Sequence, residues 1–417
     1  MSLLLNFKMD TNGIYIANIK KVSFKNFNNI KNIGFINENG NVYPWTIFLG
    51  NNGTGKTNLL KILSCMEAEE NAFESEDENY KSYTSVCSPK SEINLIHDVK
   101  LDLIQKEKIF QWESKSNSEQ GTRTGKLGDG LLIFKIYAYG VNRRVSKKVK
   151  LSSDENIENN ETLFNHNTSL INLNEWLLQT DYAVKNGQES AQKRLNLIRK
   201  VITGDIFPEI KDFRFHSNEQ LNNSVQFETD EGWFKLDDLA YGYQSTLSWI
   251  IDFCKKMFDR YPNSENPLKE PAIVLIDEID LHLHPEWQRN ITLILSNLFP
   301  KTQFIATTHS PLVIQSLEEA NVYVLNKEEK HVTINRIPNK TFKGWSVEDI
   351  LNKVMGLQSR VKSDAYLNLM ELFDKGLDNF DYETSKKAYD DLMNILPEND
   401  IQRRILDMQI KQFPEAR

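Results

Sequence analysis

The chain has 417 residues, a net charge of −8, and 40% hydrophobic and 26% charged residues, proportions that are typical of a globular protein. The acidic balance argues against a protein that coats nucleic acid with its whole surface, although 50 lysines and arginines leave room for a local basic groove. Three cysteines without CxxC spacing indicate neither a disulfide framework nor a zinc site, and they fit a reducing cytoplasm. No stretch approaches the length of a transmembrane helix, so we expect a cytoplasmic protein without a membrane partner.

In the first half of the chain, strand patterns surround a glycine-rich loop and lead into a helical segment. We predict strands at 14–27 and 46–49, a helix from Asn58, loops at 67–79 and 112–130, a strand at 131–139, a loop at 151–168 and helices at 170–204. The acidic run at 67–79 is interpreted as a solvated insertion without a function of its own. Asn174 is the predicted N-cap of the first helix in 170–204.

In the second half, two continuous apolar runs are typical of central parallel strands. The predicted order is a strand at 225–228, a helix at 246–259, central strands at 272–276 and 303–308, and helices from about residue 344 to the end. Ser346 and Asp349 form a capping-box pattern at the start of this C-terminal helical module, for which we expect three or four helices.

The segment from Gly50 to Thr57, Gly-Asn-Asn-Gly-Thr-Gly-Lys-Thr, fits the phosphate-loop pattern G-x-x-x-x-G-K-[ST] without a mismatch. Its glycines allow backbone N–H groups to turn inward as an anion nest, and the following helix adds the positive end of its dipole. We therefore expect ATP here, with Lys56 at the β and γ phosphates and Thr57 at Mg²⁺. The predicted ATP-binding residues are Asn51, Asn52, Gly53, Thr54, Gly55, Lys56, Thr57 and Asn58. The alternative is a chance match in a Gly/Asn-rich turn, which the later motifs argue against.

Two adjacent carboxylates, Asp277 and Glu278, end the apolar strand at 272–276. Acidic groups at the end of a buried strand are costly unless a cation or a substrate faces them. Asp277 is therefore predicted to bind the Mg²⁺ shell, and Glu278 to polarise the attacking water. A turn with two solvated acids is the competing interpretation, which the phosphate loop makes the minor one.

A segment before these acids resembles the signature of the ABC/SMC-type P-loop ATPases. The stretch Leu239-Ala-Tyr-Gly242-Tyr-Gln-Ser245 resembles the loose form Leu-x-x-Gly-x-x-Ser, at the distance from the acidic pair that the family shows. The resemblance implies that Gly242 and Ser245 contact the γ-phosphate held by a second copy, with Ser245 at a helix N-terminus. Ala240 and Tyr241 depart from the usual Ser-Gly, and a turn with an N-cap serine is the alternative.

Two shorter segments resemble elements of the same family. Thr308-His309-Ser-Pro follows an apolar strand and resembles the switch loop, which implies that His309 meets the γ-phosphate, although a lone histidine is more often structural. Tyr139-Gly-Val-Asn-Arg143 resembles a Tyr-Gly-x-x-Arg element of these ATPases. This implies a phosphate-sensing or lid-ordering role for Arg143, and a solvated basic turn is an equal alternative.

The segment 277–285 resembles the D-loop region of overcoming-lysogenization-type ATPases. The resemblance implies that Asp280 lies at a dimer contact. His282 and His284 within this segment have the spacing of a metal pair, and we interpret them as a structural and dimer-contact element instead.

The motifs together predict an α/β fold, namely a P-loop NTPase core of ABC/SMC type with a mixed sheet, a helical insertion and a C-terminal helical module. The resemblance spans residues 14–325 and implies ATP and Mg²⁺ as cofactors. The predicted domains are the N-terminal core with the phosphate loop and the acidic insertion at 1–150, a helical insertion or lid at 151–220, the C-terminal core with signature, acidic strand and switch histidine at 221–340, and the helical module at 341–417.

The segments 170–181 and 344–357 resemble the ATPase subunits of bacterial Septu-type and retron-associated anti-phage systems. The resemblance implies a homo-oligomer, dimer or higher, whose nucleotide state regulates a separate nuclease subunit of the HNH type. The chain shows no Toprim, HNH or PD-(D/E)xK pattern of its own. The alternative is an SMC-like DNA-repair or DNA-clamp ATPase that acts directly on DNA, so contacts with DNA or RNA stay open. A transporter ATPase fits the signature and the insertion less well.

Overall fold

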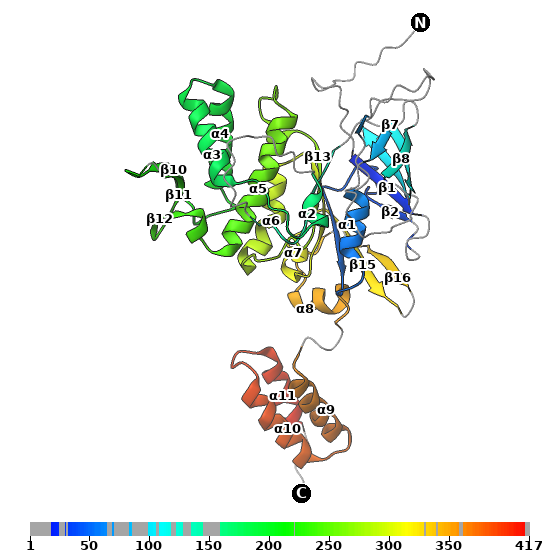
Figure 1. Ribbon diagram of the computed structural model, residues 1–417. Coiled ribbons are helices and arrows are strands. Elements are labelled where there is room, and N and C mark those ends of the chain that lie inside the picture. Colours follow the sequence, from blue (N-terminus) through cyan, green and yellow to red (C-terminus); the bar gives the residue numbers. More distant parts are fainter. Residues whose placement is uncertain are drawn as a thin grey trace. The chain divides into compact units, whose positions relative to one another are not determined.

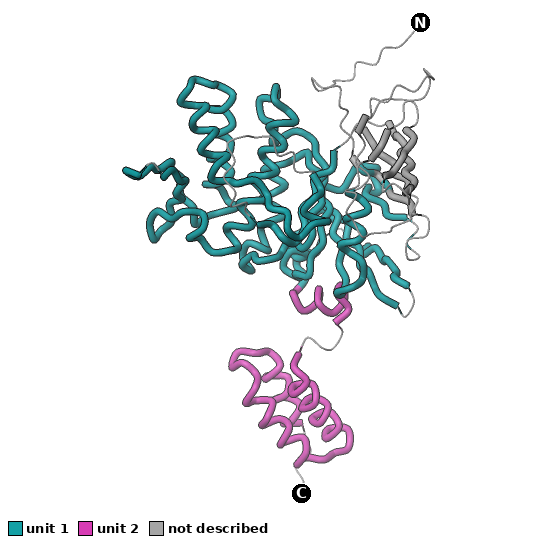
Figure 2. The backbone as a smooth tube through the Cα atoms, viewed as in Figure 1, with its two compact units in different colours: residues 1–345 teal, residues 346–417 magenta. Residues whose placement is uncertain are grey.

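The protein forms two compact units, residues 1–345 and 346–417 (Figure 2), and each unit has a hydrophobic core of its own. The computed structural model describes residues 18–24, 30, 32–64, 69–70, 83–85, 99–105, 108–117, 122–127, 135–144, 159–220, 222–328, 331–338, 341–357 and 362–412 (Figure 1).

A six-stranded mixed sheet with the order β16-β15-β3-β14-β13-β9 forms the centre of the first unit, as the predicted α/β fold requires. Five strands are parallel, and β16 pairs antiparallel with β15 at one edge. The strands are Trp45–Gly50 (β3), Ile136–Tyr139 (β9), Ala272–Ile276 (β13), Thr302–Thr307 (β14), Ala320–Lys327 (β15) and Val332–Ile337 (β16). Because β3, β14 and β13 are parallel neighbours, their carboxyl ends meet at one edge of the sheet, where ligands bind in such folds.

Side chains alternate between the two faces of this sheet, and both faces are buried. On one face, Phe48, Ile273 and Ile305 belong to a buried apolar cluster that includes helix α1 (Lys56–Ser64). The other face packs against aromatic residues of helix α5 (Tyr241–Arg260) and of the C-terminal end of helix α6 (Pro285–Leu298). The aromatic residues in successive contact there are Tyr137, Phe253, Phe299, Phe304 and Trp45.

A second sheet of the first unit is antiparallel and has the order β2-β1-β6-β7-β8-β5-β4. Its strands are Asn18–Phe24 (β1), Asn32–Gly34 (β2), Glu69–Glu70 (β4), Tyr83–Ser85 (β5), Val99–Gln105 (β6), Lys108–Asn117 (β7) and Thr122–Leu127 (β8). The loop predicted at 112–130 is therefore wrong for 112–117 and 122–127, whereas 118–121 and 128–130 lie outside the described residues. The pairing of β7 with β8 forms a backbone ladder even where polar residues dominate.

Some sequence predictions fall on residues that the structure does not describe. The acidic run at 67–79 contains β4, and its other residues lie outside the described part of the chain. The same holds for 14–17 and 25–27 of the first predicted strand and for 131–134 of the strand that ends in β9.

The helices predicted at 170–204 are confirmed as α3 (Leu173–Lys185) and α4 (Glu189–Ile202), which lie side by side (Figure 1). The predicted cap is wrong by two residues. Asn172 is the N-cap, because its side chain accepts a hydrogen bond of 3.1 Å from the N–H of Glu175. Asn174 instead accepts a hydrogen bond of 2.6 Å from the N–H of Val225, which joins the helix to strand β11 (Asn223–Thr229).

Strand β11 lies between β10 (Asp212–Ser217) and β12 (Gly232–Lys235) in an antiparallel sheet. The loop predicted at 151–168 is wrong for Glu161–Phe164, which form the short helix α2, and 151–158 lie outside the described residues. A Cβ atom at Gly140 would lie 2.2 Å from the carbonyl oxygen of Thr162, so the close approach of α2 to the end of β9 requires glycine there. The described part of the unit also contains the short helices η1 (Leu236–Asp238), η2 (Pro267–Lys269) and α7 (Pro311–Gln315).

The second unit is helical, as predicted for the residues after 344. It contains α8 (Val347–Asp349), the π-helical turn η3 (Ile350–Val354), α9 (Asp364–Asp378), α10 (Tyr382–Ile395) and α11 (Ile401–Lys411). One buried residue from each of the last three helices, Phe373, Leu392 and Leu406, forms part of its core. The predicted capping box is confirmed, because Ser346 Oγ accepts a 3.0 Å hydrogen bond from the Asp349 N–H. No helix in the described ranges has the length and apolar character that crossing a membrane requires.

Candidate nucleotide-binding site

The predicted phosphate loop connects β3 to α1, so all eight predicted ATP-binding residues lie between a buried strand and the first turn of a helix. Gly50, Gly53 and Gly55 have φ angles of 144°, 76° and 88°, which residues with a side chain rarely adopt. A Cβ atom at Gly50 would lie 2.4 Å from the carbonyl oxygen of Leu325. The glycines therefore permit a tight loop of the kind whose N–H groups bind anions.

Lys56 begins helix α1, and its side chain folds back over the phosphate loop. Its Nζ donates to the carbonyl oxygens of Gly50 at 2.7 Å and Asn51 at 3.2 Å. Burial lowers the pKa of Lys56, and the negative charges of Asp277 and Glu278 oppose that shift. The ammonium group is thus held at the loop, where it can interact with a bound phosphate.

Asp277 joins three elements of the site. Its Oδ2 accepts a 2.7 Å hydrogen bond from the Thr57 hydroxyl, and its Oδ1 accepts a 2.6 Å bond from the Thr307 hydroxyl at the end of β14. Asp277 is only 2% exposed. The phosphate loop, β13 and β14 therefore meet at one buried carboxylate.

The Thr57 and Asp277 side chains together fit a magnesium ion, because Mg²⁺ prefers oxygen ligands and keeps water and phosphate in its coordination shell. Within the described ranges, no group of three or more His, Cys, Asp or Glu residues could hold a metal ion. A metal ion at this place would therefore depend on one hydroxyl, one carboxylate, water and the nucleotide.

Glu278 has an unusual backbone conformation for a residue with a long side chain. Its φ angle is +48°, in the left-handed region, and its N–H donates a 2.7 Å hydrogen bond to the Thr307 hydroxyl. In the part of the chain that the structure describes, the Glu278 carboxylate makes no hydrogen bond, and the residue is partly exposed. This carboxylate is consequently available to a water molecule.

Asp280 holds the predicted switch loop. Its Oδ1 accepts hydrogen bonds from the Thr308 hydroxyl at 2.5 Å and from the His309 N–H at 3.3 Å. The Nε2 atom of His309 is buried and has no hydrogen-bond partner among the residues that the structure describes. Buried polar atoms are nearly always satisfied, so this nitrogen is a candidate to meet a ligand.

The predicted signature segment has a helix start other than the one expected. Helix α5 begins at Tyr241, so Ser245 lies in the second turn and is 4% exposed. The prediction that Ser245 stands at the helix N-terminus is therefore wrong, because the Ala240 carbonyl accepts from the N–H groups of Tyr243 and Gln244 and starts the helix earlier.

Gly242 lies in the first turn of α5 and packs against its own chain. A Cβ atom there would be 2.4 Å from the carbonyl oxygen of His282. His282 has a φ angle of +65°, and its ring lies 4.8 Å from that of Tyr241. His282 and His284 are both exposed, and among the described residues neither belongs to a group of three or more His, Cys, Asp or Glu residues that could hold a metal ion. Their interpretation as a structural and dimer-contact element stays a prediction.

Sequence reasoning missed or misjudged two residues of the site. Thr307 received no role, although it is the last residue of a central strand and faces Asp277. The alternative of a solvated basic turn is wrong for Arg143, which is 2% exposed and donates to the carbonyl oxygens of Asp277 and Glu278. The available signal in both cases was position, since both residues stand at or just beyond the carboxyl end of a parallel strand.

A buried strand, a glycine-rich loop, a helix with Lys56 and Thr57 at its start and an acidic pair on a neighbouring strand define a P-loop ATPase domain. Residues 46–315 match the family model described as "AAA domain, putative AbiEii toxin, Type IV TA system". The match covers more than half of the chain, so the protein belongs to this family.

Two relatives show which known proteins the sequence of this chain is similar to. Septu protein PtuA of Bacillus mycoides (strain KBAB4) is 32% identical over 368 residues, which cover 86% of this chain and 46% of that protein. "Retron Vc95 probable ATPase" of Vibrio cholerae serotype O1 biovar El Tor is 27% identical over 387 residues, 75% of this chain and 74% of that protein. This chain spans about half the length of the PtuA relatives that it matches. Among solved structures, the SMC head domain from Thermotoga maritima has 14% identity and a TM-score of 0.40, with 77% of this chain and 99% of that chain covered.

Proposed function

We propose that the protein binds and hydrolyses ATP with Mg²⁺ and serves as the cytoplasmic ATPase subunit of an anti-phage defence system. The observation that carries the proposal is the pair of hydrogen bonds at Asp277, which brings Thr57 of the phosphate loop and Thr307 of β14 to the same carboxylate. The similarity to the Septu and retron ATPases supports the biological context.

In the proposed reaction, the loop N–H groups and Lys56 bind the β and γ phosphates. Thr57 and Asp277 would hold Mg²⁺, which when bound neutralises charge that develops on the phosphates. The Glu278 carboxylate orients and polarises the attacking water. Nε2 of His309 forms a hydrogen bond with a γ-phosphate oxygen or with the water beside it. Catalysis by these residues is positioning and charge stabilisation, so turnover is expected to be slow without a trigger.

We further propose that the site is completed by a second copy of the chain, in a dimer or larger homo-oligomer. Tyr241 and Gly242 begin α5, so no earlier carbonyl of the helix can accept from their N–H groups, and this positive helix end can face a phosphate in trans. Because Ser245 is buried, this contact falls to the helix terminus and not to the Ser245 hydroxyl. Within the described part of the chain, Asp280 accepts hydrogen bonds through Oδ1, which leaves Oδ2 for a dimer contact.

The partner in the proposed system is a separate nuclease of the HNH type, whose activity depends on the nucleotide state of the ATPase. Coupling of this kind is a difference in partner affinity between two nucleotide states. Unit 346–417 carries large apolar side chains at its surface, including Phe380 between α9 and α10 and Ile401 and Met408 of α11, which are 77%, 72% and 64% exposed. Exposed apolar groups of this size support a docking role for this unit.

Native mass spectrometry of the chain, co-expressed with the genes that neighbour its own, tests this proposal with ATP present and after hydrolysis. A stoichiometric complex with an HNH-bearing protein is the expected result, and it also counts the subunits. A homodimer that forms with ATP, binds no second protein and retains DNA would instead identify a DNA clamp. DNA binding by such a clamp should weaken steeply as salt rises.

A further inference from the structure

Arg143 lies in the short segment that follows β9, and its side chain points into the interior of the first unit. Its Nε donates to the Gly140 carbonyl at 3.0 Å, and its Nη2 donates to the Glu278 carbonyl at 2.9 Å and to the carbonyl of Asp277. The planar guanidinium group thus ties its own segment to the backbone of the acidic pair.

The guanidinium group also contacts the helix that carries the signature. Its carbon lies 5.8 Å from the ring centroid of Trp249 in α5. Burial lowers the pKa of Arg143 to about 10, and the charge of Asp277 opposes this shift. The group is therefore charged at physiological pH and keeps all its donors.

Arg143 holds the backbone of Glu278, which has a strained conformation. A glutamate rarely adopts a positive φ angle unless its surroundings enforce it, and Glu278 has a φ of +48°. Its N–H donates to Thr307, and its carbonyl accepts from Arg143, so both ends of the residue are held. Loss of the Arg143 bonds would let the backbone relax and move the Glu278 carboxylate.

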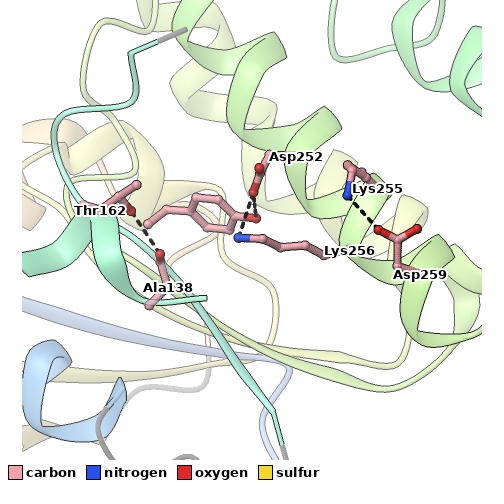
Figure 3. A network of polar contacts seen from close by, with 8 residues as sticks. Ala138, Thr162, Asp252, Lys255, Lys256 and Asp259 are labelled. Atoms are coloured by element: carbon pink, nitrogen blue, oxygen red, sulfur yellow. Dashed lines mark hydrogen bonds and ion pairs between the residues drawn. The ribbon is translucent and has the colours of Figure 1, made fainter. Parts of the chain in front are cut away.

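A second connection runs from the same segment to α5. The Asp277 N–H donates to the Tyr139 carbonyl at 2.8 Å, and the Tyr139 hydroxyl donates to Asp252 of α5 at 2.8 Å. Lys256 pairs with Asp252 at 3.0 Å, and Figure 3 shows these two side chains together. Residues 139–143 therefore join the carboxyl end of β13 to the signature helix.

We propose that Arg143 is a positioning residue for ATP hydrolysis, which fixes the backbone of Asp277 and Glu278 and so places the Glu278 carboxylate against the attacking water. It acts through these two residues and touches neither nucleotide nor metal. The inference rests on the proposed hydrolysis of ATP at this site.

The test measures kcat for ATP and the Kd of a non-hydrolysable ATP analogue for the full chain and for Arg143→Ala, Arg143→Lys and Arg144→Ala. Arg144 is the adjacent, exposed arginine and serves as the matched control. We expect kcat to fall at least about tenfold in Arg143→Ala with Kd within about threefold of the parent, because a small misplacement of a reacting group costs rate and not binding. Arg143→Lys keeps the charge but loses the planar set of N–H donors, so its kcat should lie between those of Arg143→Ala and the parent. Arg144→Ala should match the parent.

Melting curves accompany these measurements, and Arg143→Lys decides the question if Arg143→Ala does not fold. Parent-like kcat in the folded Arg143 variants would overturn the inference, as would a parallel loss of kcat and nucleotide affinity. Failure of the proposed function has a different signature, because the parent would then hydrolyse no more ATP than Lys56→Ala.

Discussion

The Thr307 hydroxyl donates to Asp277 at 2.6 Å and accepts from the N–H of Glu278 at 2.7 Å, so one threonine side chain contacts both members of the acidic pair. Thr307 closes strand β14, and Asp277 directly follows the paired strand β13. A strand with no proposed catalytic side chain of its own thereby orients Asp277, the proposed metal-binding residue, and Glu278, the proposed water-orienting residue.

Thr307→Val removes this hydroxyl with little change in volume. The buried N–H of Glu278 and an oxygen of Asp277 then lose a partner, which should lower the free energy of unfolding by about 1–3 kcal/mol. ATPase kcat should fall by about 10–100-fold because Glu278 is less firmly placed. Steady-state turnover and denaturant unfolding measure the two effects. Thr307→Ser is the control, and a Thr307→Val protein with full activity would contradict the role.

Lys56→Ala should abolish most nucleotide affinity. The variant loses a charged donor to phosphate, which weakens ATP binding by about 10–100-fold on the scale of hydrogen bonds to charged groups. Titration with a fluorescent ATP analogue measures this loss. Lys301→Ala, at an exposed lysine, should bind as the parent does. Tight binding by Lys56→Ala would show that the phosphates lie elsewhere.

Glu278→Gln should separate binding from hydrolysis. The amide no longer accepts a proton from water, so kcat should fall by about 100-fold or more, while ATP still binds. If the site is shared between two copies, the ATP-bound variant should accumulate as a closed oligomer, which light scattering detects. Unchanged turnover in this variant would remove Glu278 from its proposed role.

Tyr139→Phe tests the network that joins β9 to α5. The buried Asp252 loses one donor, so the free energy of unfolding should fall by about 1–3 kcal/mol. Burial and the adjacent Asp252 raise the pKa of the Tyr139 hydroxyl well above its ordinary value. The phenol is therefore largely protonated up to about pH 9 in both folded and unfolded chains, and the loss should not vary between about pH 6 and 9.

The control for that measurement is on the same helix. Lys255 pairs with Asp259 at 2.8 Å on the exposed side of α5 (Figure 3). Lys255→Ala should change the free energy of unfolding by no more than about 0.5 kcal/mol, because exposed pairs contribute little. Equal losses in Tyr139→Phe and Lys255→Ala would mean that the buried network adds no special stability.

The phosphate loop and the acidic strand could be read from the sequence because each depends on local geometry. Glycines with positive φ, a strand before them and a helix after them are all encoded within a few neighbouring residues. Arg143 and Thr307 were harder, since their roles depend on which strands are neighbours and on how those strands align. Neither relationship is visible in a linear pattern.

The errors have related causes. Ser245 and Asn174 are both good capping residues, but α5 already begins at Tyr241 and α3 is capped by Asn172. The polar stretch at 112–130 has loop composition, and strand pairing overrides it. Local preference was outweighed in each case by a partner distant in the sequence or by a competing start of the helix.

The alignment of the central strands limits how this protein can change in length. Ile276 of β13 is opposite Ala306 of β14, which is opposite Ile47 of β3. Asp277 and Thr307 are the next residues after Ile276 and Ala306, so they stand side by side. Deletion of one residue inside β13 would reverse the faces of the preceding side chains or bring Glu278 to the place of Asp277. Insertions and deletions are therefore compatible with an intact site only between the strands, whereas strand interiors can vary only by substitution.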